Sequence, residues 1–267
     1  MLAFANAKIN LGLNVIEKRS DGYHTLETVF YPVKIYDTIE ITDADTTFCE
    51  IRGVAIPGDS KDNLCLQAYN LLKKDFGLPP QQITLFKNIP VGAGLGGGSA
   101  DAAFLIKLVN DKFKLELSVN AMEDYARLLG ADCAFFIGNK PVYATDRGDR
   151  FEPLDIDLSS WNMVLVKPPV HVSTADAFRG LKPASPAVNV RELMSLPPDQ
   201  WKEVMKNDFE ETIFRKYPEI AQLKADLYHA GATFALMSGS GSSVFAIFDH
   251  PVTLPGLEQT NRVFYDI

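Results

Sequence analysis

A glycine-rich segment at residues 90–104, PVGAGLGGGSADAAF, is the stretch of this sequence most suggestive of chemistry. It places five glycines ahead of Ser99 and continues as an alanine-rich apolar run. Glycines leave backbone N–H groups unshielded, so the chain can approach oxygen anions closely. A helix opened by Ser99 would also point its positive end at those anions. The segment therefore predicts a phosphate-binding loop made of backbone.

Two other interpretations of this segment are open at the level of the residues. A flexible turn is one, although fixing each glycine costs about 1 kcal/mol and a turn does not need five. A dinucleotide fingerprint is the other, because Gly92, Gly94 and Gly97 match GxGxxG, which is weak evidence alone. A Rossmann unit needs a strand soon after the helix, whereas residues 118–129 have a helical pattern, and no Lys-Ser/Thr pair completes a P-loop.

Charged residues in predicted strands and turns are the next candidates for chemistry, and each has a plain structural alternative. Residues 7–15 alternate apolar and polar, which predicts a strand with Lys8 and Asn10 on its polar face. That face could simply be solvated, or Lys8 could bind a phosphate oxygen or keep a carboxylate ionised. Asp132 follows a helix-ending Gly130 and could cap the next short helix. Asp101, in the first turn after the loop, is interpreted as a partner of the helix dipole.

The elements that must position these residues alternate between sheet and helix. Strands are predicted at residues 7–15, 25–33, 36–42, 46–52, 82–86, 141–145, 163–166, 233–237 and 244–248. Helices are predicted from an N-cap at Asp62 to Phe76, after Ser99, and at residues 118–129, 201–205 and 218–230. Strands precede helices in each half, so we predict an α+β protein with two domains, residues 1–155 and 156–267.

Composition excludes several classes of protein. The formal net charge of −8 argues against a nucleic-acid binder. No apolar run approaches the roughly 18 residues of a membrane span, and no signal-peptide pattern opens the chain. Cys49, Cys65 and Cys133 are far apart and form no CxxC pair, which predicts reduced thiols in a cytoplasmic protein without a zinc site.

Four segments together resemble a known family. The glycine-rich segment resembles the central phosphate-binding motif of the GHMP small-molecule kinases. Three further segments resemble the narrower 4-diphosphocytidyl-2-C-methyl-D-erythritol kinase family. They are residues 7–30 (AKINLGLNVIEKRSDGYHTLETVF), 128–138 (LLGADCAFFIG) and 237–248 (MSGSGSSVFAIF). Two departures accompany this resemblance. Cys133-Ala134 stands where the family usually has Val-Pro, and the usual last helix is expected to be shortened or absent.

The resemblance implies a two-domain α+β GHMP kinase fold with the active site in the cleft between domains. It implies transfer of the ATP γ-phosphoryl group to the 2-hydroxyl of 4-diphosphocytidyl-2-C-methyl-D-erythritol, in the methylerythritol phosphate route to isoprenoids. ATP is the co-substrate, and Mg²⁺ is expected with it, although no ligand is assigned beyond Ser99 as a candidate. The expected partner is a small molecule with a cytidine diphosphate group, with no nucleic acid or membrane, and the oligomeric state stays open.

The resemblance also assigns roles to individual residues. Lys8 matches the catalytic lysine, and Asp132 matches the base or orienter of the substrate hydroxyl. The ATP-binding residues it implies are Pro90, Val91, Gly92, Ala93, Gly94, Leu95, Gly96, Gly97, Gly98, Ser99, Ala100 and Asn63. The substrate-binding residues it implies are Asn10, Tyr23, His24, Thr174, Phe178, Gly239 and Gly241.

Some of these roles have ordinary alternatives. Tyr23 and Phe178 would stack on the cytosine and His24 would align its edge, yet a hairpin also carries aromatic residues for packing alone. Asn63 could lie near the adenine or simply begin a helix. A mevalonate- or homoserine-type kinase is one rival, and the three aromatic residues argue against it because those substrates have no base. A nucleotide-binding regulator without catalysis is another, and Lys8 with Asp132 argues against it.

Overall fold

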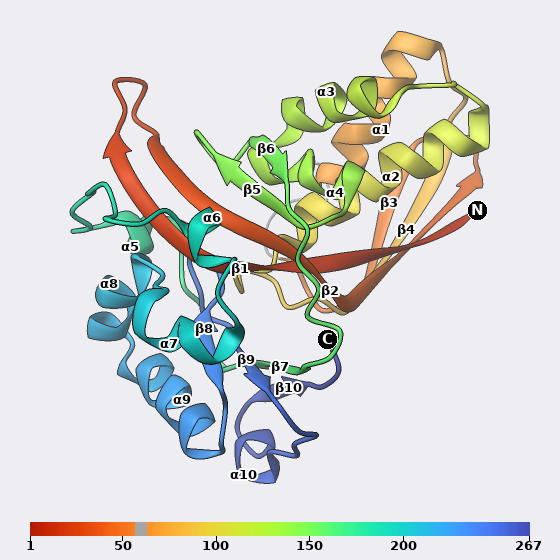
Figure 1. The fold of residues 1–267 in the computed structure, drawn as a ribbon. Helices are drawn as coiled ribbons and strands as arrows, with labels where there is room; N and C mark the ends of the chain where they lie inside the picture. Colours follow the sequence, from red (N-terminus) through yellow and green to blue (C-terminus); the bar gives the residue numbers. More distant parts are fainter. Residues whose placement is uncertain (57–62) are drawn as a thin grey trace. The chain divides into compact units, whose positions relative to one another are not determined.

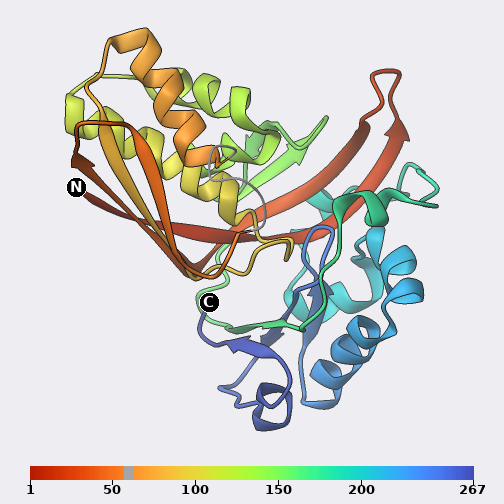
Figure 2. The ribbon, with the colours of Figure 1, turned by 180° about the vertical axis from the view of Figure 1, so that it is seen from behind.

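The computed structural model describes residues 1–56 and 63–267, and their contacts divide the chain into two units (Figures 1 and 2). Unit 1 consists of Met1–Lys8, Lys34–Val91 and Gly96–Lys140, and unit 2 consists of Ile9–Val33, Gly92–Leu95 and Pro141–Ile267. Both units thus take residues from the two long N-terminal strands, β1 (Leu2–Lys18) and β2 (His24–Asp43). This division differs from the single boundary near residue 155, which stays a sequence-based prediction.

Unit 1 is a sheet with helices against it. Its further elements are β3 (Phe48–Gly53), α1 (Leu64–Phe76), β4 (Gln81–Lys87), α2 (Gly97–Phe113), α3 (Val119–Leu129), a 3₁₀ turn (Ala131–Cys133) and α4 (Phe135–Gly138). Strand β4 pairs parallel to β3 and antiparallel to β2. Every second residue of β4, including Ile83 and Leu85, is fully buried, and α1, α2 and α3 contact one another (Figure 1). Alternation along β4 is therefore the alternation of a half-buried strand.

Unit 2 contains two sets of paired strands. Its elements are β5 (Val142–Thr145), β6 (Arg150–Pro153), β7 (Asn162–Lys167), α5 (Thr174–Phe178), α6 (Val190–Leu193), a 3₁₀ turn (Pro198–Gln200), α7 (Trp201–Val204), α8 (Phe209–Lys216), α9 (Pro218–His229), β8 (Phe234–Met237), β9 (Val244–Phe248), α10 (Pro255–Glu258) and β10 (Arg262–Phe264). The N-terminal part of β2 pairs with β5, and β5 pairs with β6. The other four strands form an antiparallel sheet in the order β10-β7-β9-β8.

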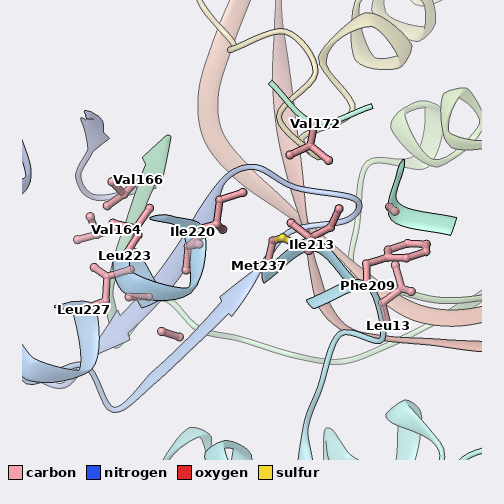
Figure 3. Packing of buried hydrophobic residues seen from close by; sticks show 14 of the residues in the cluster. Leu13, Val164, Val166, Val172, Phe209, Ile213, Ile220, Leu223, Leu227 and Met237 are labelled. Carbon is pink, nitrogen blue, oxygen red and sulfur yellow. The ribbon is translucent and has the colours of Figure 1, made fainter. Parts of the chain in front are cut away.

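The core of unit 2 lies between this four-stranded sheet and its helices (Figure 3). Phe209 and Ile213 of α8 and Leu223 of α9 belong to one buried cluster with Val164 of β7 and Met237 of β8. The apolar residues of α9 recur at helical spacing, because one face of the helix must cover the sheet. Strand β8 ends at Met237, a member of this cluster, and residues 238–243 (SGSGSS), called here the second glycine loop, follow it.

Most predicted elements are present, and three details of the sequence-based prediction are corrected. Helix α2 begins at Gly97, two residues before the predicted start at Ser99. Residues 25–42 form one continuous strand instead of two. Lys8 and Asn10 are 4% and 2% exposed, so both faces of β1 are buried here and the polar face is not solvated. The alternation in β1 therefore separates an apolar buried face from a polar buried face. A periodicity of two in the sequence cannot show whether the polar face meets protein or solvent.

The sequence also predicts where α1 starts. The proposed N-cap Asp62 lies outside the described residues. Asn63 caps the helix in the structure, because its side-chain oxygen accepts a hydrogen bond from the backbone N–H of Cys65 at 2.8 Å. Within residues 1–56 and 63–267, no helix has both the length and the apolar character needed to cross a bilayer.

Candidate active site

Lys8 and Asp132 lie together in unit 1. The Lys8 ammonium is 3.5 Å from Oδ2 of Asp132, with side-chain exposures of 5% and 35%. Burial lowers the pKa of Lys8, and the Asp132 charge and hydrogen bond oppose that effect. Asp132 sits in the 3₁₀ turn that follows α3, and β1 supplies Lys8. The chain thus pairs a buried cation with a carboxylate that solutes can still reach.

The glycine loop passes directly beside Lys8. A Cβ placed on Gly96 would come within 3.3 Å of Cε of Lys8 and within 3.0 Å of the Phe136 ring. Gly96 also has a φ of +68°, a conformation that favours glycine. The loop therefore approaches Lys8 by its backbone, which is the proximity that the family resemblance implies.

Helix α2 begins without a side-chain cap. Its N-cap is Gly96, and no side chain accepts a hydrogen bond at that position. The first N–H groups of the helix, at Gly97, Gly98 and Ser99, precede any i−4 carbonyl inside it. This end of a 17-residue helix presents N–H groups that have no acceptor within the helix, together with the positive end of the dipole. Such a helix start suits a phosphate group and supports the predicted phosphate-binding loop made of backbone N–H groups.

The predicted ATP-binding residues are divided between the two units. Pro90, Val91, Gly96, Gly97, Gly98, Ser99, Ala100 and Asn63 belong to unit 1, and Gly92, Ala93, Gly94 and Leu95 belong to unit 2. Ser99 hydrogen-bonds the buried Cys133 thiol, whose pKa burial raises to about 11. Leu64 follows Asn63, and its Cδ1 would lie 3.9 Å from a Cβ on Gly98. Asn63 is thus near the start of α2. Its side-chain oxygen caps α1, and its backbone oxygen accepts a hydrogen bond from the N–H of Gln67 at 3.1 Å.

Gly94 contacts the second glycine loop within unit 2. A Cβ on Gly94 would come within 1.9 Å of the backbone oxygen of Ser238, and the Ser238 hydroxyl donates to the Gly94 carbonyl at 2.9 Å. The backbone N–H of Asn10 donates to Ser238 Oγ at 3.3 Å, and Asn10 Oδ1 would lie 3.3 Å from a Cβ on Gly239. Gly94 and Gly239 are therefore required by the packing of one loop on the other. Ligand contact is not the only reason for these glycines.

Asn207 is a residue of this loop system that the sequence did not single out. It is 2% exposed, and its side-chain amide donates to the carbonyls of Met237 and Gly239, both at 2.8 Å. Its side-chain oxygen accepts from the N–H of Phe209 at 3.0 Å at the start of α8. One asparagine before a helix carries no sequence signal for such a role, because its partners lie about thirty residues away.

The three aromatic residues predicted to bind cytosine belong to unit 2. The His24 ring stacks on Phe178 with centroids 4.5 Å apart and an interplanar angle of 19°. Burial lowers the pKa of His24, and Lys18 lowers it further. Tyr23 is 60% exposed, with the Arg147 guanidinium 5.4 Å from its ring centroid. His24 and Phe178 are in direct contact, so no base fits between these two rings as they stand.

The remaining predicted substrate residues lie on unit 2 loops and helix ends. Thr174 is the exposed first residue of α5, which Ser173 caps by accepting from the N–H of Asp176 at 3.1 Å. Gly241 has a φ of +86°, and a Cβ there would come within 2.7 Å of Sδ of Met237. Gly241 is thus explained by local backbone geometry.

A substitution at Gly98 tests the predicted phosphate-binding loop. Gly98 lies exposed in the first turn of α2, with a φ outside the glycine region. Among the described residues, a Cβ on it would have only Leu64 within 4 Å. Gly98→Ala should raise the KM for ATP about tenfold, because one phosphate contact to a backbone donor is worth about 1.5–3 kcal/mol. The melting temperature should stay or rise, because alanine is the better helix former. Kinetics and thermal unfolding of the same preparation measure both effects.

The matched control for that variant is Gly138→Ala. Gly138 ends α4, and a Cβ on it meets nothing within 4 Å. Its KM for ATP should equal that of the unmodified protein. An unchanged KM in Gly98→Ala as well would remove the role of the α2 start in ATP binding.

Comparison with known proteins first defines the class of kinases whose domains match this chain. The GHMP kinases N terminal domain matches residues 63–139, and the GHMP kinases C terminal domain matches residues 187–257. A crystal structure of mevalonate kinase superposes with a TM-score of 0.75, covering 99% of this chain and 98% of that one, at 13% identity. At that identity the likeness concerns the fold alone, and the chain has the fold of the GHMP kinases.

Closer relatives narrow this class. The 4-diphosphocytidyl-2-C-methyl-D-erythritol kinase of Bacteroides fragilis is 53% identical over 93% of this chain and 92% of its own length. That of Bacteroides thetaiotaomicron is 49% identical over 99% and 98%. A crystal structure of 4-(cytidine 5'-diphospho)-2C-methyl-D-erythritol kinase has a TM-score of 0.86 and 30% identity, covering 99% of this chain and 98% of that one. The chain belongs to the 4-diphosphocytidyl-2-C-methyl-D-erythritol kinase family.

Proposed function

We propose that this protein transfers the γ-phosphoryl group of ATP to the 2-hydroxyl of 4-diphosphocytidyl-2-C-methyl-D-erythritol, giving the 2-phosphate and ADP. The reaction belongs to the methylerythritol phosphate route of isoprenoid precursor biosynthesis. The observation that carries the proposal is the Lys8–Asp132 pair, 3.5 Å apart beside the glycine loop, in a chain of this family. Relatives at 53% and 49% identity bear the name of that kinase.

The two charged residues divide the chemistry between them. Phosphoryl transfer has a loose transition state, so positioning and charge neutralisation matter more than full removal of the hydroxyl proton. Asp132 is partly exposed and orients the attacking hydroxyl as a hydrogen-bond acceptor. Lys8 is buried beside it and offsets negative charge on the transferring group. Their ion pair, 3.5 Å long, holds the two side chains side by side for this role.

Mg²⁺ is part of this proposal as a companion of ATP. The described residues contain no group of three or more histidine, cysteine or acidic side chains placed to hold a metal. Mg²⁺ does not need such a cage, because it is commonly bound by one or two carboxylates together with substrate phosphates. Asp132 supplies such a carboxylate beside the glycine loop, whereas the Ser99 hydroxyl is hydrogen-bonded to the Cys133 thiol. When bound, the ion neutralises charge on the β- and γ-phosphates.

Tyr23 is proposed as the stacking platform for the cytosine, with His24 at the edge of the base and Phe178 opposite. Because His24 covers Phe178 in the structure, the base must displace the imidazole to reach that ring. Tyr23→Ala should weaken the cytidyl substrate by about 1–3 kcal/mol and leave the KM for ATP unchanged. Steady-state kinetics with each substrate varied in turn measure this. Equal losses for both substrates would mean that Tyr23 does not distinguish the two nucleotides.

Phe178 is a less clear probe of the same contact. Its ring also packs edge-on against Phe209 with centroids 4.8 Å apart, and it borders the unit 2 core. Phe178→Ala therefore changes both the stability of the fold and the binding of the cytidyl substrate. Tyr23→Ala, at an exposed residue, changes substrate binding alone.

The proposed reaction is tested with a substrate panel and ATP, followed by phosphorus NMR. A new phosphate monoester from the cytidyl substrate, and none from mevalonate or homoserine, is the expected result. A product from mevalonate or homoserine alone would replace the proposed substrate. ATP binding without any product would favour a regulator that has lost catalysis.

A further inference from the structure

Three charged side chains lie buried together in unit 1, apart from Lys8 and Asp132. Lys87, at the end of β4, forms ion pairs with Asp37 of β2 and with Asp101 of α2, the second at 2.7 Å. Their exposures are 3%, 0% and 2% in the order Lys87, Asp37, Asp101. Two ionised carboxylates facing one ammonium would leave a net negative charge in the interior. Such a charge is expensive away from water.

The two carboxylates are not equivalent. Asp37 uses both oxygens: Oδ2 pairs with Lys87, and Oδ1 accepts from the backbone N–H groups of Asn88 at 2.5 Å and Ile89 at 2.8 Å. Asp101 pairs with Lys87 through Oδ2, and no other donor among the described residues reaches its buried Oδ1. Besides burial, a side-chain hydrogen bond with Asp37 raises the pKa of Asp101, as expected where two carboxyls meet and one carries a proton. Three donors stabilise the charge on Asp37, and one stabilises it on Asp101. A proton shared within this cluster therefore belongs on Asp101.

This cluster connects both ends of the glycine loop. Asn88 and Ile89, which Asp37 holds by their N–H groups, directly precede Pro90 at the start of the loop. Asp101 lies one helical turn after Gly97, the first residue of α2. A Cβ on Gly97 would lie 3.3 Å from the Lys87 ammonium. The cluster thus fixes the strand before the loop to the helix after it, beneath the residues that cradle phosphate.

We infer that Asp101 is a positioning residue for the phosphate loop and acts in its protonated form, within a neutral Lys87–Asp37–Asp101 cluster. Loss of that proton would place an uncompensated charge under the first turn of α2, on the side from which the helix presents its N–H groups. The loop would then bind ATP less well. The inference rests on the proposed function only in taking ATP as the anionic ligand.

The electrostatic surroundings of Asp101 agree with this assignment. Burial raises its pKa to about 8; Lys87 opposes the rise and Asp37 adds to it. Burial lowers the pKa of Lys87, but its two carboxylates outweigh that effect and raise it overall. The thiols of Cys65 on α1 and Cys49 on β3 also face Asp101, and burial raises the pKa of each. The raised pKa of Asp101 thus agrees with the proton that the hydrogen-bond pattern places on it.

The first test is the pH dependence of folding in Asp101→Asn. A carboxyl whose pKa is higher in the folded state keeps its full stabilisation below its unfolded pKa and loses it as the pH rises toward the folded value. One such proton changes the folding equilibrium constant by up to about tenfold per pH unit between about pH 5 and pH 8. Urea unfolding should show this decline in the parent protein relative to Asp101→Asn. Parallel stability curves would overturn the inference.

The second test separates positioning from a merely structural role. Asparagine resembles the protonated acid, so Asp101→Asn should keep the parent KM for ATP near pH 7. Above about pH 8 the parent KM should rise relative to that of the variant, with kcat changing less. Asp37→Asn is the matched comparison. It replaces by an amide the carboxylate that accepts from three donors, the Lys87 ammonium and the N–H groups of Asn88 and Ile89. This variant should raise the KM for ATP at least tenfold. Equal losses in the two variants at pH 7 would contradict a proton on Asp101.

If Asp37→Asn does not fold, the stability curves of Asp101→Asn and its KM profile still decide the inference. Failure of the proposed reaction gives a different result. The unmodified protein would then yield no product from the cytidyl substrate, while the pH-dependent difference in stability between it and Asp101→Asn would persist.

Discussion

Replacing Lys8 by methionine or Asp132 by asparagine should lower kcat by about 10²–10⁴-fold, the range that a positioned acid–base group contributes. The KM values for both substrates should change little, because each contact is strengthened mainly in the transition state. The structure supports this expectation with the 3.5 Å ion pair and with the approach of Gly96 to Lys8. Steady-state kinetics with both substrates varied measure the two parameters.

The double variant provides the sharper measurement. Two groups that act as one unit fail together, so the losses in Lys8→Met and Asp132→Asn should be far from additive. Asp132→Asn keeps the size of the side chain, and Asp132 is partly exposed, so its melting temperature should stay close to that of the parent. Turnover near the parent rate in folded Asp132→Asn would exclude Asp132 from the chemistry. Additive losses would mean that the two residues act separately.

Gly94→Ala should destabilise the protein by about 2–5 kcal/mol. The methyl group would come within 1.9 Å of the Ser238 carbonyl oxygen, which is backbone and cannot rotate away. The residue also has a φ of +77°, where a Cβ costs about 1–2 kcal/mol. Overpacking of this kind adds about 1–3 kcal/mol. Denaturant unfolding of the purified variant gives the free energy.

Gly77→Ala separates the two contributions to that loss. Gly77 has a φ of +64° as the C-cap of α1, and nothing lies within 4 Å of its Cβ position. It should lose only the cost of the backbone conformation, about 1–2 kcal/mol. Gly94→Ala should therefore be the more damaging of the two. Equal losses would show that the loop yields and that Gly94 is not required by its contact with Ser238.

The sequence predicts those parts of the site that depend on neighbouring residues. Five glycines followed by a helical pattern predict the loop through local backbone geometry, although α2 begins two residues before the predicted Ser99. The alternation around Lys8 predicts β1. The family resemblance adds Asp132, and the structure places it beside Lys8. The alternation does not predict that Lys8 is buried. Whether the second face of a strand meets solvent or protein depends on chain far away in the sequence.

The parts that the sequence misses depend on distant partners. Counted from Ser99, Asp101 falls in a first turn and is predicted to be a partner of the helix dipole. Because α2 begins at Gly97, Asp101 lies beyond its first turn, paired with Lys87 from β4 and near Asp37 from β2. Asn207 contacts carbonyls about thirty residues later in the chain. Each is an ordinary polar residue in its local context. Only the strand pairing and helix packing of the folded chain bring Asp101 and Asn207 each within reach of its own partners.

The sharing of β1 and β2 between the units has a consequence for how the chain folds during synthesis. Unit 1 is completed by residue 140, so it can form while the ribosome is still extending the chain. Residues 9–33 are made early, yet most of their unit comes from residues 141–267. Until those emerge, the apolar β1 residues Leu13 and Val15 lack the partners of their buried cluster. A pause after residue 140 would therefore expose an aggregation-prone strand to chaperones.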